Sequence, residues 1–159
     1  MILIYKTLII ICLGLIFYQD NKSREVFWFL FPALGILLCF LFFKYSYLNF
    51  IILSMVFNSL LISTIVIILY VYTKLIAKIK FLNHSFGLGD LLFFYAISLG
   101  FPTLTFIILF TFSILFSCLV YFLFKKNKST VPLAGYMSLF LLSTIIVSVF
   151  IDYPILYIH

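Results

Sequence analysis

Residues 48–73, LNFIILSMVFNSLLISTIVIILYVYT, decide the fold, because they form a long apolar run without one charged side chain. A helix needs about 20 predominantly apolar residues to cross the hydrocarbon core of a bilayer, and this run is longer than that. It therefore predicts a transmembrane helix.

The rest of the chain has the same character. Hydrophobic residues make up 67% of the 159 residues and charged ones 9%, with a mean hydropathy of +1.36, which excludes an ordinary soluble domain. Five further apolar segments can be drawn, at residues 2–18, 26–43, 91–103, 104–124 and 131–151. We predict an all-α polytopic membrane protein, a bundle of six transmembrane helices forming one domain over residues 1–159 with no soluble domain.

The count of six depends on the interruption at Gly100-Phe101-Pro102. A five-span alternative would merge residues 91–124 into one kinked helix, which is too long for a single crossing of about 30 Å. We expect instead a helix over Leu91–Leu99 followed by a tight turn.

The basic residues indicate the orientation. Eight of the ten lie in loops on one side of the predicted bundle: Lys22, Arg24, Lys74, Lys78, Lys80, Lys125, Lys126 and Lys128. The positive-inside rule makes this side cytoplasmic and places both termini outside a cell membrane. The net charge of +6 is explained by topology and attraction to anionic lipid, so the expected partner is the bilayer and not nucleic acid.

Polar residues within the predicted spans are uncharged and helically spaced, which is typical of sides that face other helices. They are Ser54, Asn58, Ser59, Ser113, Ser117, Thr144 and Ser148. A transporter would need an ionisable or hydrophilic path through the midplane, and no span centre carries an ionisable residue. The three cysteines have no CxxC spacing, and we expect no metal and no cofactor.

The chain has only four carboxylates: Asp20, Glu25, Asp90 and Asp152. With six spans, the end of the first and the start of the fourth lie on one membrane face, whereas the end of the sixth lies on the other. Asp20 and Asp90 can therefore meet at similar depth, and Asp152 cannot join them.

Two carboxylates brought together in a low-dielectric setting share one proton. One can then take a proton from an attacking water while the other polarises a peptide carbonyl, which is the chemistry of an aspartic protease. Asp90 follows Gly87-Leu88-Gly89, and glycines permit unusual backbone conformations and the close approach of a peptide.

Other interpretations of these residues stay open. Asp20 and Asp90 would also suit helix caps or partners of Lys22, Arg24 or Lys80. Glu25 competes with Asp20 for the catalytic role, although its place before Val26 suits a first-turn acid interacting with a helix dipole. His84 would tune the pair or lie solvated in its loop.

Gly87-Leu88-Gly89-Asp90 at the start of the fourth span, with Asp20-Asn21-Lys22-Ser23-Arg24-Glu25-Val26 after the first, resembles the type IV prepilin peptidases and archaeal preflagellin peptidases. These are GxGD aspartyl proteases. Val131-Pro132-Leu133-Ala134-Gly135-Tyr136 resembles a Pro- and Gly-containing stretch of that family.

The resemblance implies that Asp20 and Asp90 are catalytic, supported by the motif residues Gly87, Gly89, Pro132 and Gly135. It also implies a prepilin-like substrate whose basic leader is cut at the cytoplasmic face. Many members carry Pro-Asn where this chain has Phe27-Trp28, and a lysine where it has Leu91-Leu92. These departures favour an alternative, a catalytically inactive family member acting as a membrane scaffold or assembly subunit.

Overall fold

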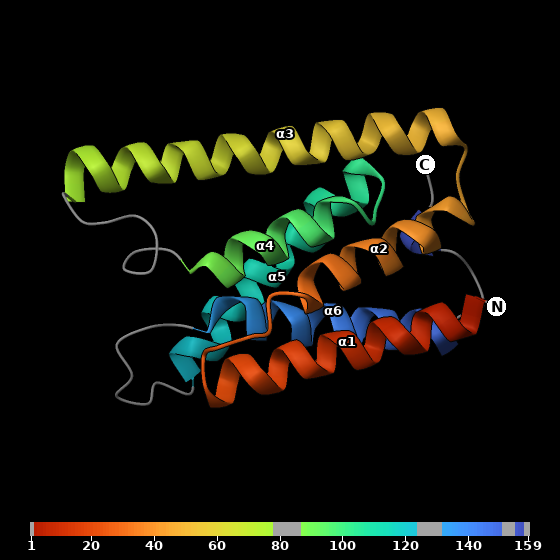
Figure 1. Ribbon diagram of the computed structural model, residues 1–159, viewed down its shortest axis with the longest axis horizontal. Coiled ribbons are helices and arrows are strands. Elements are labelled where there is room, and N and C mark those ends of the chain that lie inside the picture. The colour runs from red at the N-terminus through yellow and green to blue at the C-terminus, as the bar shows by residue number, and fades with distance from the viewer. Residues whose placement is uncertain (1, 78–86, 124–131, 151–154, 158–159) are drawn as a thin grey trace.

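The computed structural model describes residues 2–77, 87–123, 132–150 and 155–157. Within these ranges helices are the only regular secondary structure, and the six predicted helices are present (Figure 1). They are α1 (Ile2–Lys22), α2 (Leu30–Phe43), α3 (Leu48–Tyr72), α4 (Leu88–Ser98), α5 (Thr103–Leu123) and α6 (Leu133–Phe150). A π-helical turn, Thr73–Ala77, continues α3, and a 3₁₀ turn, Ile155–Tyr157, lies near the C-terminus.

The helices form a bundle in which α1 and α6 pack side by side along one edge and α3 lies along the other, with α2, α4 and α5 between them (Figure 1). The end of α1, the start of α4 and the start of α6 all lie at one end of the bundle, and the start of α1 and the end of α6 lie toward the other. This common end, where Asp20 and Asp90 are located, is called the inner end below.

In the described part of the chain, four helices are long and apolar enough to cross a membrane: Ile2–Lys22, Leu48–Leu75, Thr103–Leu123 and Leu133–Phe150. Two helices in the middle of the bundle, α2 and α4, are shorter. With 14 and 11 residues, α2 and α4 are about 21 Å and about 16 Å long, less than the hydrocarbon thickness of a typical bilayer. The chain is therefore a multi-pass membrane protein whose two short helices are flanked by the long ones.

The predicted interruption between α4 and α5 is confirmed, and the merged five-span helix is wrong. Helix α4 ends at Ser98, α5 begins at Thr103, and the turn between them contains Gly100 and Pro102. Asn58 of α3 fastens this turn, because its side-chain amide donates to the carbonyl oxygens of Ser98 at 3.1 Å and Phe101 at 2.9 Å. The expectation that polar residues within the spans face other helices is confirmed at this buried asparagine.

Gly100 allows the turn to approach α2. A β-carbon added at Gly100 would lie 2.6 Å from the β-carbon of Leu38, a separation that requires the backbone to shift. We predict that Gly100→Ala lowers the free energy of unfolding by about 1–3 kcal/mol through overpacking. Thermal unfolding in detergent measures this, with Gly14→Ala as the control, because its added β-carbon would meet only Leu142 Cδ1, at 3.8 Å. Equal stability of the two variants would contradict the prediction.

The loop between α1 and α2 exposes three consecutive aromatic residues at the inner end. Phe27, Trp28 and Phe29 are each more than half exposed, and the Phe27 amide donates to Gln19 Oε1 at 3.1 Å, which ties the loop to α1. Aromatic side chains of this kind accumulate at membrane–water interfaces. We therefore expect this loop to lie at a boundary of the membrane.

Trp28 is the only tryptophan and is 71% exposed, so its fluorescence reports this depth directly. In vesicles we expect stronger quenching of Trp28 by lipids labelled near the headgroup than by lipids labelled at the chain ends. Aqueous iodide should quench it weakly. Strong iodide quenching without quenching by either labelled lipid would place the loop in water and contradict the prediction.

Candidate functional site: two aspartates at one helix N-terminus

The first turn of α6 lies at the inner end of the bundle, and two of its backbone amides have no acceptor within the helix. The first amides of any helix lack partners within the helix, and Pro132, which precedes α6, has neither an N–H group nor a side-chain acceptor to cap them. Two carboxylates from other helices accept these hydrogen bonds instead. Ala134 N–H donates to Asp90 Oδ1 at 2.8 Å, and Gly135 N–H donates to Asp20 Oδ2 at 2.6 Å.

The side chains of the two aspartates are therefore held by the backbone amides of consecutive residues at the N-terminus of α6. The sequence-based expectation that they meet at one end of the bundle agrees with this geometry. The positive end of the α6 dipole favours negative charge at this point. A site of this kind can hold one ionised and one protonated carboxyl group next to each other.

Asp20 comes from the last turn of α1 and is only 9% exposed. A carboxylate there is unfavourably placed in the dipole of its own helix, so capping α1 does not explain it. Pairing with Lys22 does not explain it either, because the Lys22 ammonium donates to the Tyr18 hydroxyl at 3.1 Å and lies over the same ring. The bond to Gly135 holds its carboxylate, and the positive charge of Arg24, another partner considered from the sequence, also acts on it.

Asp90 lies in the first turn of α4, ahead of the apolar segment 91–103, and Gly87 is the N-cap residue of this helix. A β-carbon at Gly87 would lie 2.9 Å from Asp90 Oδ2, and one at Gly89 would lie 3.5 Å from Phe31 Cζ. Gly87 has ordinary dihedrals, φ −72° and ψ 136°, and no described glycine has a positive φ. The described glycines do not use the unusual conformations that glycine permits: Gly87 leaves room for the carboxylate of Asp90 itself, and a β-carbon at Gly89 would make only an ordinary contact with Phe31.

Burial, and to a smaller extent the negative charge of Asp20, raise the pKa of Asp90 to about 6 against the lowering effect of hydrogen bonds from Ala134 and Gly87. The repulsion shows that the two carboxylates interact electrostatically. Asp90 therefore carries a proton in mildly acidic solution, where an ordinary aspartate has lost it.

This pKa predicts a pH dependence of stability. Between pH 3.8 and about pH 6 the folded protein holds a proton that the unfolded chain has released, so the contribution of Asp90 to stability falls as the pH rises through that window. We expect the unfolding temperature of the wild type to fall from pH 4 to pH 7 relative to that of Asp90→Asn. Parallel profiles for the two proteins would contradict the raised pKa.

One expectation about a competing acid was wrong. Glu25 does not lie in a helical first turn, because α2 begins at Leu30 and its first turn contains no acid. Its side chain is exposed in the loop, outside the aspartate pair. Arg24 beside it has a positive φ of 59°, which is uncommon for a residue with a side chain.

Several residues considered from sequence lie outside the described ranges. They are Lys78, Lys80, His84, Lys125, Lys126, Lys128, Val131 and Asp152. Among the described residues, no group of three or more His, Cys, Asp and Glu side chains is placed to hold a metal ion.

Sequence reasoning missed the backbone of Ala134 as a binding group. The usable signal was Pro132 followed by small residues at the start of an apolar run, because proline favours the first positions of a helix and leaves the next amides in need of acceptors. Gln19, which holds the aromatic loop, was also missed, and its neighbours in the sequence give no such signal.

Comparison with known proteins finds no match. No family model, curated protein or solved structure matches the chain. Function is therefore inferred from the residues of the chain itself.

Proposed function

We propose that this protein is a membrane aspartic endopeptidase with Asp20 and Asp90 as its catalytic pair. The observation that carries the proposal is the binding of two carboxylates, from α1 and α4, to consecutive amides of α6. Two acids held together in a partly buried site, one with a pKa of about 6, are the groups that peptide hydrolysis by water requires.

In the proposed reaction the two aspartates share one proton. The ionised carboxylate removes a proton from water as the water oxygen attacks the peptide carbonyl carbon. The protonated partner donates a hydrogen bond to the carbonyl oxygen. The tetrahedral intermediate then collapses, the C–N bond breaks, and the leaving amine receives a proton from the pair.

The N-terminus of α6 would keep the two carboxyl groups in place and in the ionisation state that the reaction needs. The amide of Gly135 binds one oxygen of Asp20, and the amides of Ala134 and Gly87 bind Asp90. Together with the helix dipole, they favour the single negative charge that the reaction needs. These donors hold the catalytic groups and do not contact the peptide.

We further propose that the substrates are prepilin-like membrane proteins, cut between a short basic leader and a hydrophobic helix. This rests on the resemblance of the residues around Asp20 and Asp90 to the type IV prepilin and preflagellin peptidases. It agrees with a site at the end of the long apolar helix α1, near a membrane boundary. The proposed location is a cell membrane, with the aspartates at the cytoplasmic face and both termini outside.

A second candidate, an inactive family member acting as a scaffold, is favoured by the same hydrogen bonds. Both carboxylates stabilise the start of α6, and a purely structural role would need nothing more. The two functions differ in what an asparagine can replace: its side-chain oxygen still accepts a bond from an amide, but it supplies no acid or base.

The test is cleavage of a co-expressed pilin precursor by the wild type and by Asp90→Asn at matched membrane levels. Gel mobility and N-terminal sequencing of the product identify the cut. Cleavage lost only in the variant supports the endopeptidase. Equal processing by both proteins removes Asp90 from the mechanism, and no processing of any of a panel of pilin precursors favours the scaffold.

A further inference from the structure

Lys6 places a positive charge inside the first transmembrane helix. It lies four residues after the start of α1, about 6 Å along a helix that is long and apolar enough to cross the membrane. Charged side chains within such helices are rare and usually have a definite partner. The Lys6 ammonium is partly buried and donates a hydrogen bond to the backbone carbonyl oxygen of Ser148 at 2.6 Å. The proposed reaction does not use this residue.

Ser148 lies in the last turn of α6, where carbonyl groups lack partners within the helix. Because α6 ends at Phe150, the carbonyl of Ser148 has no amide four residues further along the same helix. A positive charge is favourable at this end of the α6 dipole. Lys6 therefore binds the end of α6 as Asp20 binds its start, and both charged side chains come from α1.

Three contacts show how α1 and α6 are aligned. Each joins a residue of α1 to one of α6, and the pairs are Lys6 with Ser148, Gly14 with Leu142, and Asp20 with Gly135. From the first pair to the last, α1 advances by 14 residues and α6 runs back by 13. These lengths are about 21 Å and about 20 Å, so one antiparallel alignment satisfies both hydrogen bonds.

The two polar contacts are what hold this alignment. Between Lys6 and Asp20, α1 carries no charged side chain. Apolar helix surfaces in lipid exchange one neighbour for another at little cost, because hydrocarbon solvates them equally well. A slide by one helical turn, about 5.4 Å, would separate both charged groups from their partners. Single polar residues in apolar helix interfaces set the register of helices in this way.

We propose that Lys6 is a positioning residue for Asp20. It holds α1 in the alignment at which the Asp20 carboxylate reaches the Gly135 amide, although it lies at the other end of the helix. The inference rests on the proposed endopeptidase, because a catalytic carboxylate needs a more exact position than a helix cap does.

Glycine-selective nitrogen isotope labelling reads the position of Asp20 by NMR without any substrate. The chain has only six glycines, and the resonance lost in Gly135→Ala identifies Gly135. A short hydrogen bond to a carboxylate shifts an amide proton downfield. In detergent micelles we expect this signal to move upfield in Lys6→Met, which removes the charge and the donor. It should stay in place in Lys6→Arg, which keeps both.

Cleavage of a pilin precursor gives the second readout. In Lys6→Met, kcat per folded molecule should fall about tenfold with KM unchanged, because displacement of a catalytic group slows the chemical step. Lys6→Arg should restore the wild-type kcat. A residue that only stabilised the fold would change the amount of folded protein and leave kcat per folded molecule as it is.

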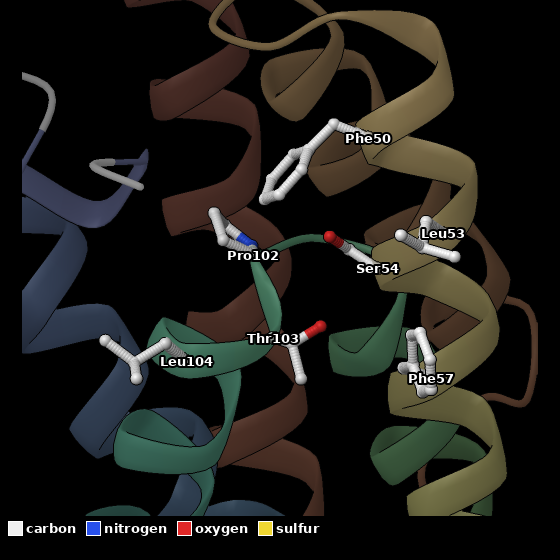
Figure 2. Close-up of a pocket in the computed structure, with 7 residues that line it drawn as sticks. All are labelled: Phe50, Leu53, Ser54, Phe57, Pro102, Thr103 and Leu104. Atoms are coloured by element: carbon white, nitrogen blue, oxygen red, sulfur yellow. The ribbon is translucent and has the colours of Figure 1, made fainter.

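Two controls separate positioning from a loss of charge and from a loss of stability. Lys44→Met removes an exposed lysine at the end of α2 and should change neither readout. Phe50→Ala enlarges a cavity of about 270 Å³ between α3 and the start of α5, which Phe50 lines (Figure 2). It should lower the unfolding temperature without moving the Gly135 signal or kcat per folded molecule.

A Gly135 signal that stays in place in folded Lys6→Met overturns the proposal, and so does a displaced signal with wild-type kcat. Should Lys6→Met fail to fold, Lys6→Gln replaces it, because its uncharged side chain ends one bond short of the lysine nitrogen and should give the same displacement. If the wild type cleaves no precursor while the signal still responds to Lys6, the endopeptidase function fails and the catalytic role of Lys6 fails with it. Wild-type cleavage with an insensitive signal overturns the role of Lys6 alone.

Discussion

Asp90→Asn and Asp20→Asn should each lower the rate of precursor cleavage by about 10²–10⁴-fold, the usual contribution of a general acid or base. Asparagine can still accept the hydrogen bonds from Ala134 and Gly135, so the start of α6 should stay capped. The rate is measured by cleavage of a pilin precursor in membranes, and folding by thermal unfolding of the purified protein. We expect loss of activity without a comparable loss of stability.

The alanine variants provide the matched comparison. Asp20→Ala and Asp90→Ala remove both the acid–base chemistry and the acceptor oxygen, so they should be inactive and also less stable, by about 1–2 kcal/mol for a lost helix cap. If the asparagine variants cleave normally and only the alanine variants fail, the carboxylates are caps and the scaffold function is the better one.

Gly135→Ala should lower cleavage by about 100-fold, because a displacement of about 1 Å in a catalytic group has an effect of that size. The added β-carbon would lie 2.8 Å from Asp20 Oδ2 and 3.1 Å from Asp20 Cβ. Asp20 must therefore move away from the Gly135 amide. The measurement is the cleavage rate at matched expression, together with the unfolding temperature.

Gly14→Ala is the control for this variant, since it also places alanine in a helix but meets only an ordinary contact with Leu142. It should cleave at the wild-type rate and be slightly more stable, by about 0.5–1 kcal/mol. Wild-type cleavage by Gly135→Ala would mean that the close approach of α6 to Asp20 is not required for activity.

The meeting of Asp20 and Asp90 was predictable because it follows from the number of membrane-crossing segments between them. The number of helices sets which of their ends lie together, and this placed Asp20 and Asp90 at one face without any knowledge of packing. The role of Glu25 was not predictable in the same way. Its assignment depended on where α2 begins, and four residues separate the expected start at Val26 from the observed start at Leu30. Helix boundaries are the least certain feature of a sequence pattern.

The role of the glycines also depended on tertiary contacts. A GxGD sequence is compatible with an unusual backbone, with close packing, or with room for a neighbouring carboxylate. Gly87 leaves room for a neighbouring carboxylate, because a β-carbon there would press on Asp90 Oδ2. At Gly89 the neighbour is Phe31. Neither neighbour can be identified from the local sequence.

The amino-acid sequence by itself determined that the chain is helical and lies in a membrane, and which end of the bundle carries both aspartates. It did so because long apolar runs have only one stable arrangement in hydrocarbon, a helix that satisfies its own backbone. Only the tertiary structure decided that Asp20 and Asp90 bind consecutive amides of α6. Asp20 and Gly135 are 115 residues apart, and their hydrogen bond exists because α1 and α6 pack side by side with the start of one at the end of the other.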